Sequence, residues 1–290
     1  MGKGSNPFVL LDILPEQRGK NNMANVKAHL VDETPSFKLG RPQRPNYYHD
    51  NGHLGKPGEP MKPLRPAVAG DWLAQRSGFA YLNGSELICA EYDVVGLKFS
   101  PNKIADDCGG LQPDANKAYR HFLEASGKSR TIDYEKYIKE EENGPKVAPA
   151  LAKVFIPHIE AIGRNRHGTL SVTSKHMYNI GGNVATRLVG GPQKTNWTRA
   201  IGVHVLWVSA DVTVRATATQ IQYDAALTMH VEDQFNFNPG SKDDKSGKHD
   251  ADNGRLEECG LAKQYMTFAT WHRSLKWTEG DEKSVVISLK

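Results

Sequence analysis

The chain has 290 residues, a net charge of +4, a charged fraction of 24% and a mean hydropathy of −0.56. A mild basic excess favours approach to anionic membranes or phosphate-bearing ligands, and the lack of a dense basic face argues against nucleic-acid binding. No apolar run approaches the roughly 18 residues of a membrane-spanning helix. Three cysteines without a C-x-x-C pair argue against a disulfide framework and a structural zinc site.

Residues 1–64 are expected to form an extended arm. Proline and glycine recur between Pro35 and Pro63, which favours extended backbone with little apolar surface to bury. The arm is either a disordered tail or a docking or translocation segment for a secretion carrier or an import receptor. The first 20 residues lack the apolar core of a signal peptide, so we expect a protein made in the cytoplasm and exported by another machine.

Residues 65–168 are expected to be mainly helical. A helix over 65–83 should bury a stripe that includes Val68, Trp72 and Ala74. Proline at 113 and apolar residues at helical spacing predict a second helix that stops at Gly127. Two more helices are predicted over 134–141 and 147–162.

Residues 169–290 are expected to form the β region that carries the site. Segments 201–209, 211–217 and 219–231 are rich in Val, Thr, Ile and Tyr and predict an antiparallel meander, with later strands at 265–277 and 285–289. The predicted fold class is therefore α+β, with a helical half packed on an antiparallel, partly rolled sheet after an extended arm.

The strand that runs from Tyr223 to Val231 has the clearest pattern in the chain, because its odd positions are apolar and its even positions are mostly polar. Asp233 keeps the apolar parity, so a strand without a bulge would carry this carboxylate to the edge of the core. Burial of a carboxylate raises its pKa unless it is paired, and such groups are common among catalytic acids and bases. The alternative is that Asp233 caps the turn that follows.

Two short segments occur in the order found in a known toxin family. Residues 96–104 read Gly-Leu-Lys-Phe-Ser-Pro-Asn-Lys-Ile and follow a helix that starts near Pro66; residues 233–238 read Asp-Gln-Phe-Asn-Phe-Asn. On these segments, within roughly residues 66–278, the chain resembles the colicin M family. The resemblance implies an antibacterial toxin that cleaves lipid II, the peptidoglycan precursor, at its lipid–pyrophosphate bond. It also implies a need for Mg²⁺ and action on the periplasmic side of the target membrane.

The chain departs from the family motif, Asp-x-Tyr-Asp-x-Asn followed by His-Arg. Asp233 and Asn238 match it, whereas Phe235 replaces the tyrosine and Asn236 replaces the second aspartate. The His-Arg pair is missing near residue 242. Either neighbouring residues rebuild the chemistry, or the scaffold has a different target.

The polar loop 241–254 and the arginine that follows it supply candidate replacements. His249 is the nearest histidine for a general base, and Arg255 is the nearest arginine for phosphate binding. Asp243 and Asp252, with Asp233, are predicted Mg²⁺ ligands because carboxylate oxygens suit this cation. A solvated charged loop would have the same composition.

The predicted function is therefore an antibacterial toxin that hydrolyses lipid II at the periplasmic membrane surface. Asn236 and Asn238 would orient substrate or metal around Asp233. A producing cell that contains the same target would need an immunity protein. The alternative is a non-enzymatic toxin or binding module, pore-forming or partner-binding, that keeps the scaffold without the catalytic set. His204, embedded between apolar residues, is expected to be a hydrogen-bonded core histidine.

Overall fold

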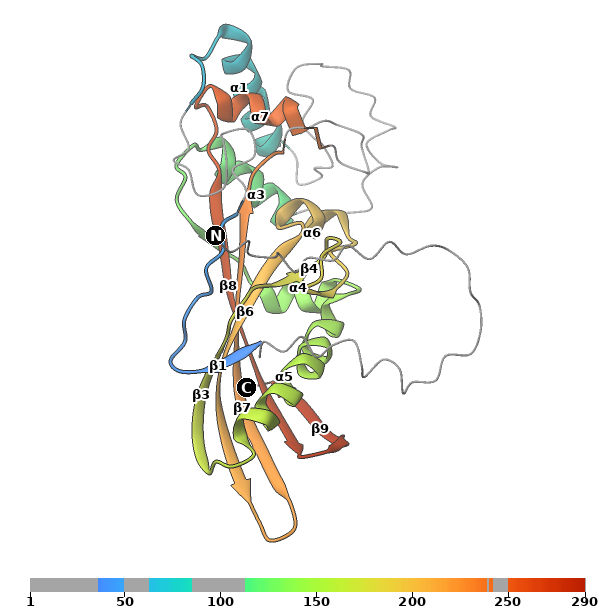
Figure 1. Cartoon of the computed structure of the whole chain (residues 1–290). Helices are drawn as coiled ribbons and strands as arrows, with labels where there is room; N and C mark the ends of the chain where they lie inside the picture. The colour runs from blue at the N-terminus through green and yellow to red at the C-terminus, as the bar shows by residue number, and fades with distance from the viewer. Residues whose placement is uncertain (1–35, 50–62, 85–112, 239, 242–249, 290) are drawn as a thin grey trace, which may run out of the picture. The chain divides into compact units, whose positions relative to one another are not determined.

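The computed structural model describes residues 36–49, 63–84, 113–238, 240–241 and 250–289 (Figure 1). The backbone of 77–84, 251 and 252 is included without the side chains. The predicted Asp243 and His249 sites and the segment 96–104 lie outside the described residues. The fold class is α+β, as the sequence predicted.

Helices and strands are distributed as follows along the described chain. The helices are α1 (Ala69–Gly84), α3 (Pro113–Leu123), α4 (Tyr134–Glu140), α5 (Val147–Gly163), α6 (Thr195–Ala200) and α7 (Asp250–Glu258). The strands are β1 (Phe37–Leu39), β2 (Arg130–Thr131), β3 (Gly168–Ser174), β4 (Tyr178–Ile180), β5 (Arg187–Val189), β6 (His204–Ala216), β7 (Ile221–Phe235), β8 (Tyr265–Thr278) and β9 (Asp281–Leu289). The predicted helices over 113–126, 134–141 and 147–162 correspond to α3, α4 and α5.

The described strands form one nine-stranded sheet with the main order β1-β3-β6-β7-β8-β2. Strands β6, β7 and β8 are long and antiparallel, and they form its centre. The predicted break near residue 210 is wrong, because β6 runs unbroken through Asp211. Neither glycine nor proline interrupts this strand, and Asp211 pairs with Ala226 of β7 while it accepts a hydrogen bond from Ser171.

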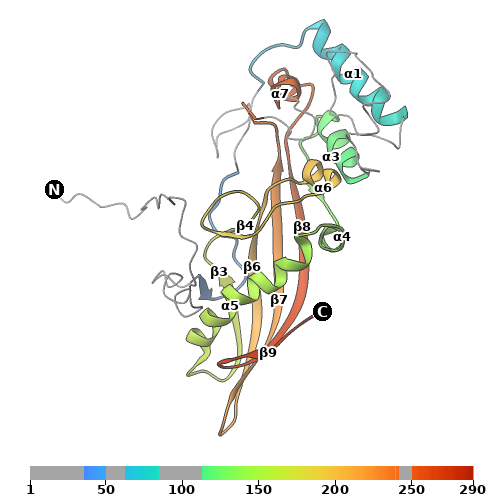
Figure 2. The ribbon, with the colours of Figure 1, turned by 90° about the vertical axis from the view of Figure 1, so that its right-hand side faces the viewer.

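Helices α4 and α5 lie across one face of the sheet (Figure 2). The odd residues of β7, from Tyr223 to Val231, point to this face and are buried. They pack with Tyr134 of α4 and with Phe155 and Ile159 of α5. The alternation predicted for this strand is confirmed, and it builds the main core.

Part of the predicted arm is packed against the sheet. Strand β1 pairs with β3, and Phe37 is 1% exposed, with its ring 5.0 Å from that of Phe155. Farther along, Arg44 forms a bidentate pair with buried Glu232 of β7, at 2.7 Å and 2.9 Å. The segment 36–49 therefore belongs to the folded structure, whereas 1–35 and 50–62 lie outside the described residues.

The stripe predicted for the first helix is confirmed at Ala74 and wrong at Val68 and Trp72. Val68 and Trp72 are 57% and 49% exposed, whereas Asp71 and Ala74 are completely buried. The cause is electrostatic: two arginines bind Asp71 on the inner side of α1 and fix which face the helix buries. No described helix is long and apolar enough to span a membrane.

Candidate functional site

Asp233 lies two residues before the end of β7, on the face of the sheet that carries the core. It pairs with Thr267 of β8, and the register of the β7–β8 pair continues before and after it without a bulge. The residue is 9% exposed. The sequence prediction that this carboxylate reaches the edge of the core is therefore confirmed.

A row of polar side chains crosses three strands at this point. Thr267 pairs with Asp233 on one side and with Arg130 of the short parallel strand β2 on the other. Because directly paired residues share a face of the sheet, the three side chains lie on the same side. The Thr267 hydroxyl and Arg130 Nη1 are buried and have no hydrogen-bond partner. Buried orphan groups of this kind commonly bind water or a ligand.

The pKa of Tyr265 reflects the charges of two residues in this polar row. Burial raises the pKa of Tyr265 well above its usual range; the Arg130 guanidinium opposes this shift, and the Asp233 carboxylate adds to it. The Tyr265 hydroxyl donates to the carbonyl of Ala118, 2.8 Å away. Positive and negative side chains thus converge on a neutral, buried phenol at the end of the sheet.

An aromatic cluster holds the chain as it leaves β7. Phe235 stacks on Tyr265 with ring centroids 5.1 Å apart, and Phe237 contacts Phe122 and Tyr119 of α3. Phe235 occupies the place of the tyrosine in the colicin M motif, and here its ring fills an apolar contact. The cluster fixes the direction of the segment that carries Asn236 and Asn238.

The two asparagines are half-buried, and the backbone of the second is tied to helix α7. The Asn238 N–H donates to Asp250 Oδ2 at 2.9 Å, and the Asp250 N–H donates to the carbonyl of Ser241 at 3.0 Å. These bonds start α7 at Asp250, inside the stretch predicted to be loop up to Gly254. Asp250 therefore fixes the geometry of the segment that follows Asp233.

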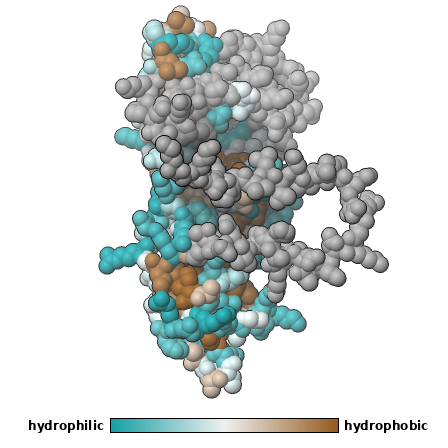
Figure 3. Space-filling model, in the orientation of Figure 1, coloured by the Kyte–Doolittle hydropathy of each residue, from teal (hydrophilic) through white to brown (hydrophobic). Residues whose placement is uncertain are grey.

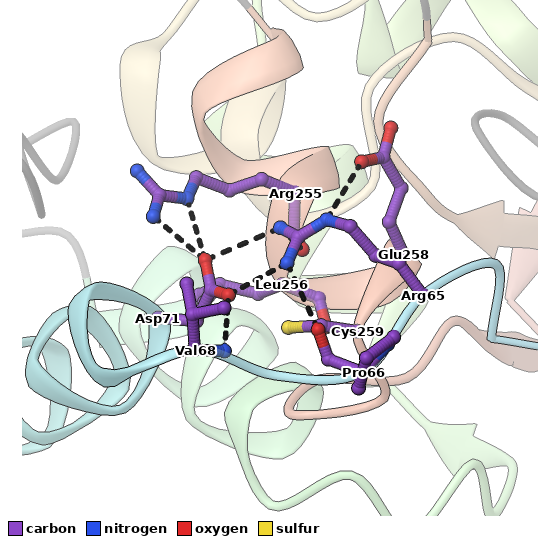
Figure 4. Close-up of polar contacts among 8 residues, drawn as sticks. All are labelled: Arg65, Pro66, Val68, Asp71, Arg255, Leu256, Glu258 and Cys259. Carbon is purple, nitrogen blue, oxygen red and sulfur yellow. Dashed lines mark hydrogen bonds and ion pairs between the residues drawn. The ribbon is translucent and has the colours of Figure 1, made fainter.

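Arg255, the predicted phosphate ligand, is bound to Asp71 of α1 (Figure 4). Its Nε and Nη2 donate to Asp71 Oδ1 at 3.0 Å and 2.6 Å, and Arg65 Nη1 donates to Oδ2 at 2.7 Å. The Arg65 guanidinium above all holds the pKa of Asp71 well below its usual range. The Arg255 guanidinium thus neutralises a buried aspartate in this structure.

The predicted Mg²⁺ site can be compared with the structure only at Asp233. Asp243 and His249 lie outside the described residues, and Asp252 is described only by its backbone in α7. Among the described side chains, no group of three His, Cys, Asp or Glu residues is placed to hold an ion. Magnesium binding therefore remains a prediction that depends on Asp243 and Asp252.

Glu257 is a buried carboxyl that the sequence analysis did not identify. It is 1% exposed, and burial raises its pKa to about 8, so it is mostly protonated at neutral pH. Gln264 Nε2 donates to its Oε2 at 2.6 Å, and Gln264 Oε1 accepts from Gln234 at 2.6 Å, while Oε1 of Glu257 has no partner. Glu257 therefore connects α7 to the residue that follows Asp233.

The core role predicted for His204 is confirmed. It is 1% exposed, its Nδ1 lies 2.9 Å from the carbonyl of Gly202, and its Nε2 lies 2.8 Å from the Tyr134 hydroxyl. Burial lowers its pKa to about 4, so the ring is neutral and both nitrogens have partners. Nothing remains for it to bind.

Comparison with known proteins yields one structural similarity. No protein-family model matches the chain, and no curated protein matches it. A solved structure that does match is that of PaeM, a colicin M-like bacteriocin produced by Pseudomonas aeruginosa. The TM-score is 0.38 and the sequence identity 14%, over 73% of this chain and 69% of PaeM. This is a weak structural relationship, so the function has to rest on the residues of this chain.

Proposed function

We propose that this protein is an antibacterial toxin of the colicin M type that hydrolyses the lipid–pyrophosphate linkage of lipid II. The observation that carries the proposal is the position of Asp233, a buried carboxylate at the end of the strand where the resemblance expects the essential acid. A buried carboxylate is costly to desolvate unless it is paired, and buried carboxylates beside basic groups are common among catalytic residues.

The polar row supplies groups that suit such a substrate. Arg130 has a buried N–H without a partner, which matches a phosphate oxygen. Asp233 would orient the attacking water, whose proton passes to the base as its oxygen bonds to phosphorus and the lipid alkoxide leaves and takes up a proton. Asn236 and Asn238, held by the aromatic cluster and Asp250, would orient the substrate.

The proposal keeps His249 as the base, and Asp233, Asp243 and Asp252 as Mg²⁺ ligands. Bound Mg²⁺ would neutralise the charge of the pyrophosphate. Because Arg255 binds Asp71, Arg130 replaces it as the favoured phosphate ligand. The protein would act in the periplasm of the target cell after delivery by a carrier or a receptor, and its producer would carry an immunity protein.

The test is direct incubation of the purified full chain with lipid II and Mg²⁺, followed by detection of released undecaprenol. Asp233→Asn should abolish release while the melting temperature is unchanged. Asp224→Asn is the matched control, because Asp224 lies on the same strand but on the other face, paired with Lys276 at 3.2 Å. Equal loss in both variants, or none in either, would contradict the role of Asp233.

A non-enzymatic toxin or binding module is the second candidate. The observation that favours it is the ion pair between Arg255 and Asp71, which removes a predicted substrate-binding group from the site. The replacement of the motif tyrosine by Phe235 points the same way. Killing by the exported protein without lipid II turnover, and unaffected by Asp233→Asn, would establish this alternative.

A further inference from the structure

At the start of helix α1, whose side chains are described as far as Arg76, an aspartate faces the protein and large apolar side chains face the outside. Asp71 and Ala74 are completely buried, whereas Val68, Trp72 and Leu73 are 57%, 49% and 62% exposed. A helix on a protein surface normally has the reverse arrangement. The inversion therefore needs a physical cause and suggests a use for the outer face.

The inner face is fixed by hydrogen bonds from several directions. Arg65 and Arg255 bind the two oxygens of Asp71, and the Val68 N–H donates to Oδ2 at 3.0 Å. One turn later, Gln75 donates to the carbonyls of Leu123 and Leu261. Rotation of α1 to bury its apolar side would leave these buried groups unpaired, which costs on the order of 3–5 kcal/mol.

Large apolar side chains are exposed at the start of α1 and in the segment that leads into it. They are Leu64, Val68, Trp72 and Leu73, which we name the α1 patch; Leu64 is 64% exposed. Val68 and Trp72 lie one turn apart, since the Trp72 N–H donates to the Val68 carbonyl. In the space-filling view, the end of the molecule formed by α1 shows apolar side chains among polar ones (Figure 3).

The charged side chains around the α1 patch are three arginines and two carboxylates, one of which is Glu258, 30% exposed and paired with Arg65 at 3.6 Å. Asp71 is the only acidic residue between 63 and 76, and it is buried and bound by two arginines. Arg76 is exposed beside the patch, and Arg65 and Arg255 keep part of their side chains in solvent. An exposed tryptophan and leucine flanked by arginines match an interface between water and anionic lipid.

We propose that the α1 patch docks the protein on the surface of an anionic lipid bilayer, with Trp72 and Leu73 inserted at the headgroup level. The inference rests on the proposed function in one respect: lipid II is held in such a membrane, so docking would bring the protein to its substrate. The binding itself requires no lipid II, and it can be measured with lipid alone.

The test is sedimentation of the full-length protein with vesicles of phosphatidylglycerol and phosphatidylethanolamine, beside vesicles of phosphatidylcholine alone. We expect preferential binding to the anionic vesicles, and a loss of about tenfold or more in affinity for Leu73→Ser and a larger loss for the double variant with Trp72→Ser. Leu289→Ser is the matched control, because Leu289 is 69% exposed on β9 and should bind as the parent does.

Fluorescence identifies the inserted residue. Among the five tryptophans of the chain, Trp197, Trp271 and Trp277 are buried and Trp207 stacks on His230, so a blue shift on vesicle addition should vanish in Trp72→Phe. Absence of binding, or equal binding by the double variant, would overturn the proposal. So would loss of killing in the double variant with intact vesicle binding, which would assign the patch to a protein partner. Vesicle binding without lipid II hydrolysis would instead remove only the proposed function.

Discussion

Glu257 should make the stability of this protein depend on pH in a way that one substitution removes. Burial raises the pKa of Glu257 from 4.5 to about 8, because the charged carboxylate is disfavoured in its site between α7 and the ends of β7 and β8. The folded pKa lies above the unfolded one, so the folded state binds the proton more tightly. The stabilisation is complete below about pH 4.5 and is lost as the pH rises to about 8.

The size of the effect follows from the pKa difference. Each pKa unit corresponds to about 1.4 kcal/mol, so ionisation of Glu257 should remove on the order of 4 kcal/mol of unfolding free energy between about pH 4.5 and pH 8. Glu257→Gln is nearly isosteric and stays neutral, so it should lack this loss. The charged neighbours Asp250 and Glu258, which raise the pKa further, remain in both proteins.

The assay is urea unfolding of the parent and of Glu257→Gln at about pH 5 and about pH 8.5, with the unfolding free energy extrapolated to water. The parent should lose about 4 kcal/mol more than the variant on the change to high pH. Glu142→Gln is the control, because the Glu142 side chain is 77% exposed and lies 3.9 Å from Lys146, and it should behave as the parent. The same pH dependence in the parent and in Glu257→Gln would refute the reasoning.

Three further predictions concern ion pairs and delivery. Arg44→Ala leaves buried Glu232 without its arginine partner, and denaturant unfolding near neutral pH should show a loss of about 2 kcal/mol that shrinks in acid; an unchanged midpoint would mean that the Arg44–Glu232 pair contributes nothing. Asp71→Asn leaves two guanidiniums without their shared anion and should cost about 3 kcal/mol in the same assay, whereas Asp224→Asn should cost under about 1 kcal/mol. Expression with an export signal should stop growth while cytosolic expression is tolerated, and equal toxicity from the cytosol would contradict a periplasmic target.

The β region could be predicted from the sequence because strand alternation is a local signal. The parity of Tyr223 to Val231 fixes the core face of β7, and with continuous register it also places Asp233. The α-helices that begin at Pro113, Tyr134 and Val147 are marked by proline or by apolar spacing, and these are local signals that do not depend on distant contacts. Local chemistry therefore decides these elements and one residue of the candidate site.

The rest depends on contacts between residues far apart in the chain. The orientation of α1 depends on Arg255 as well as on the nearby Arg65, and Asp71 precedes Arg255 by 184 positions. Arg130 joins the polar row only because two residues of β2 pair with β8, and no periodicity reveals so short a strand. Glu257 looks like an ordinary surface glutamate in sequence, and only the packing of α7 against Gln264 shows that it is buried.

The measurement that tests the central claim most directly is lipid II turnover by the purified parent protein and by Asp233→Asn, with both melting temperatures recorded. We predict that the parent releases undecaprenol in the presence of Mg²⁺ and that the variant releases none. The unfolding free energy of the variant should lie within about 1 kcal/mol of that of the parent. Undiminished turnover by a folded Asp233→Asn protein would contradict the account. So would the absence of turnover by a parent protein that kills cells when it is exported to their periplasm.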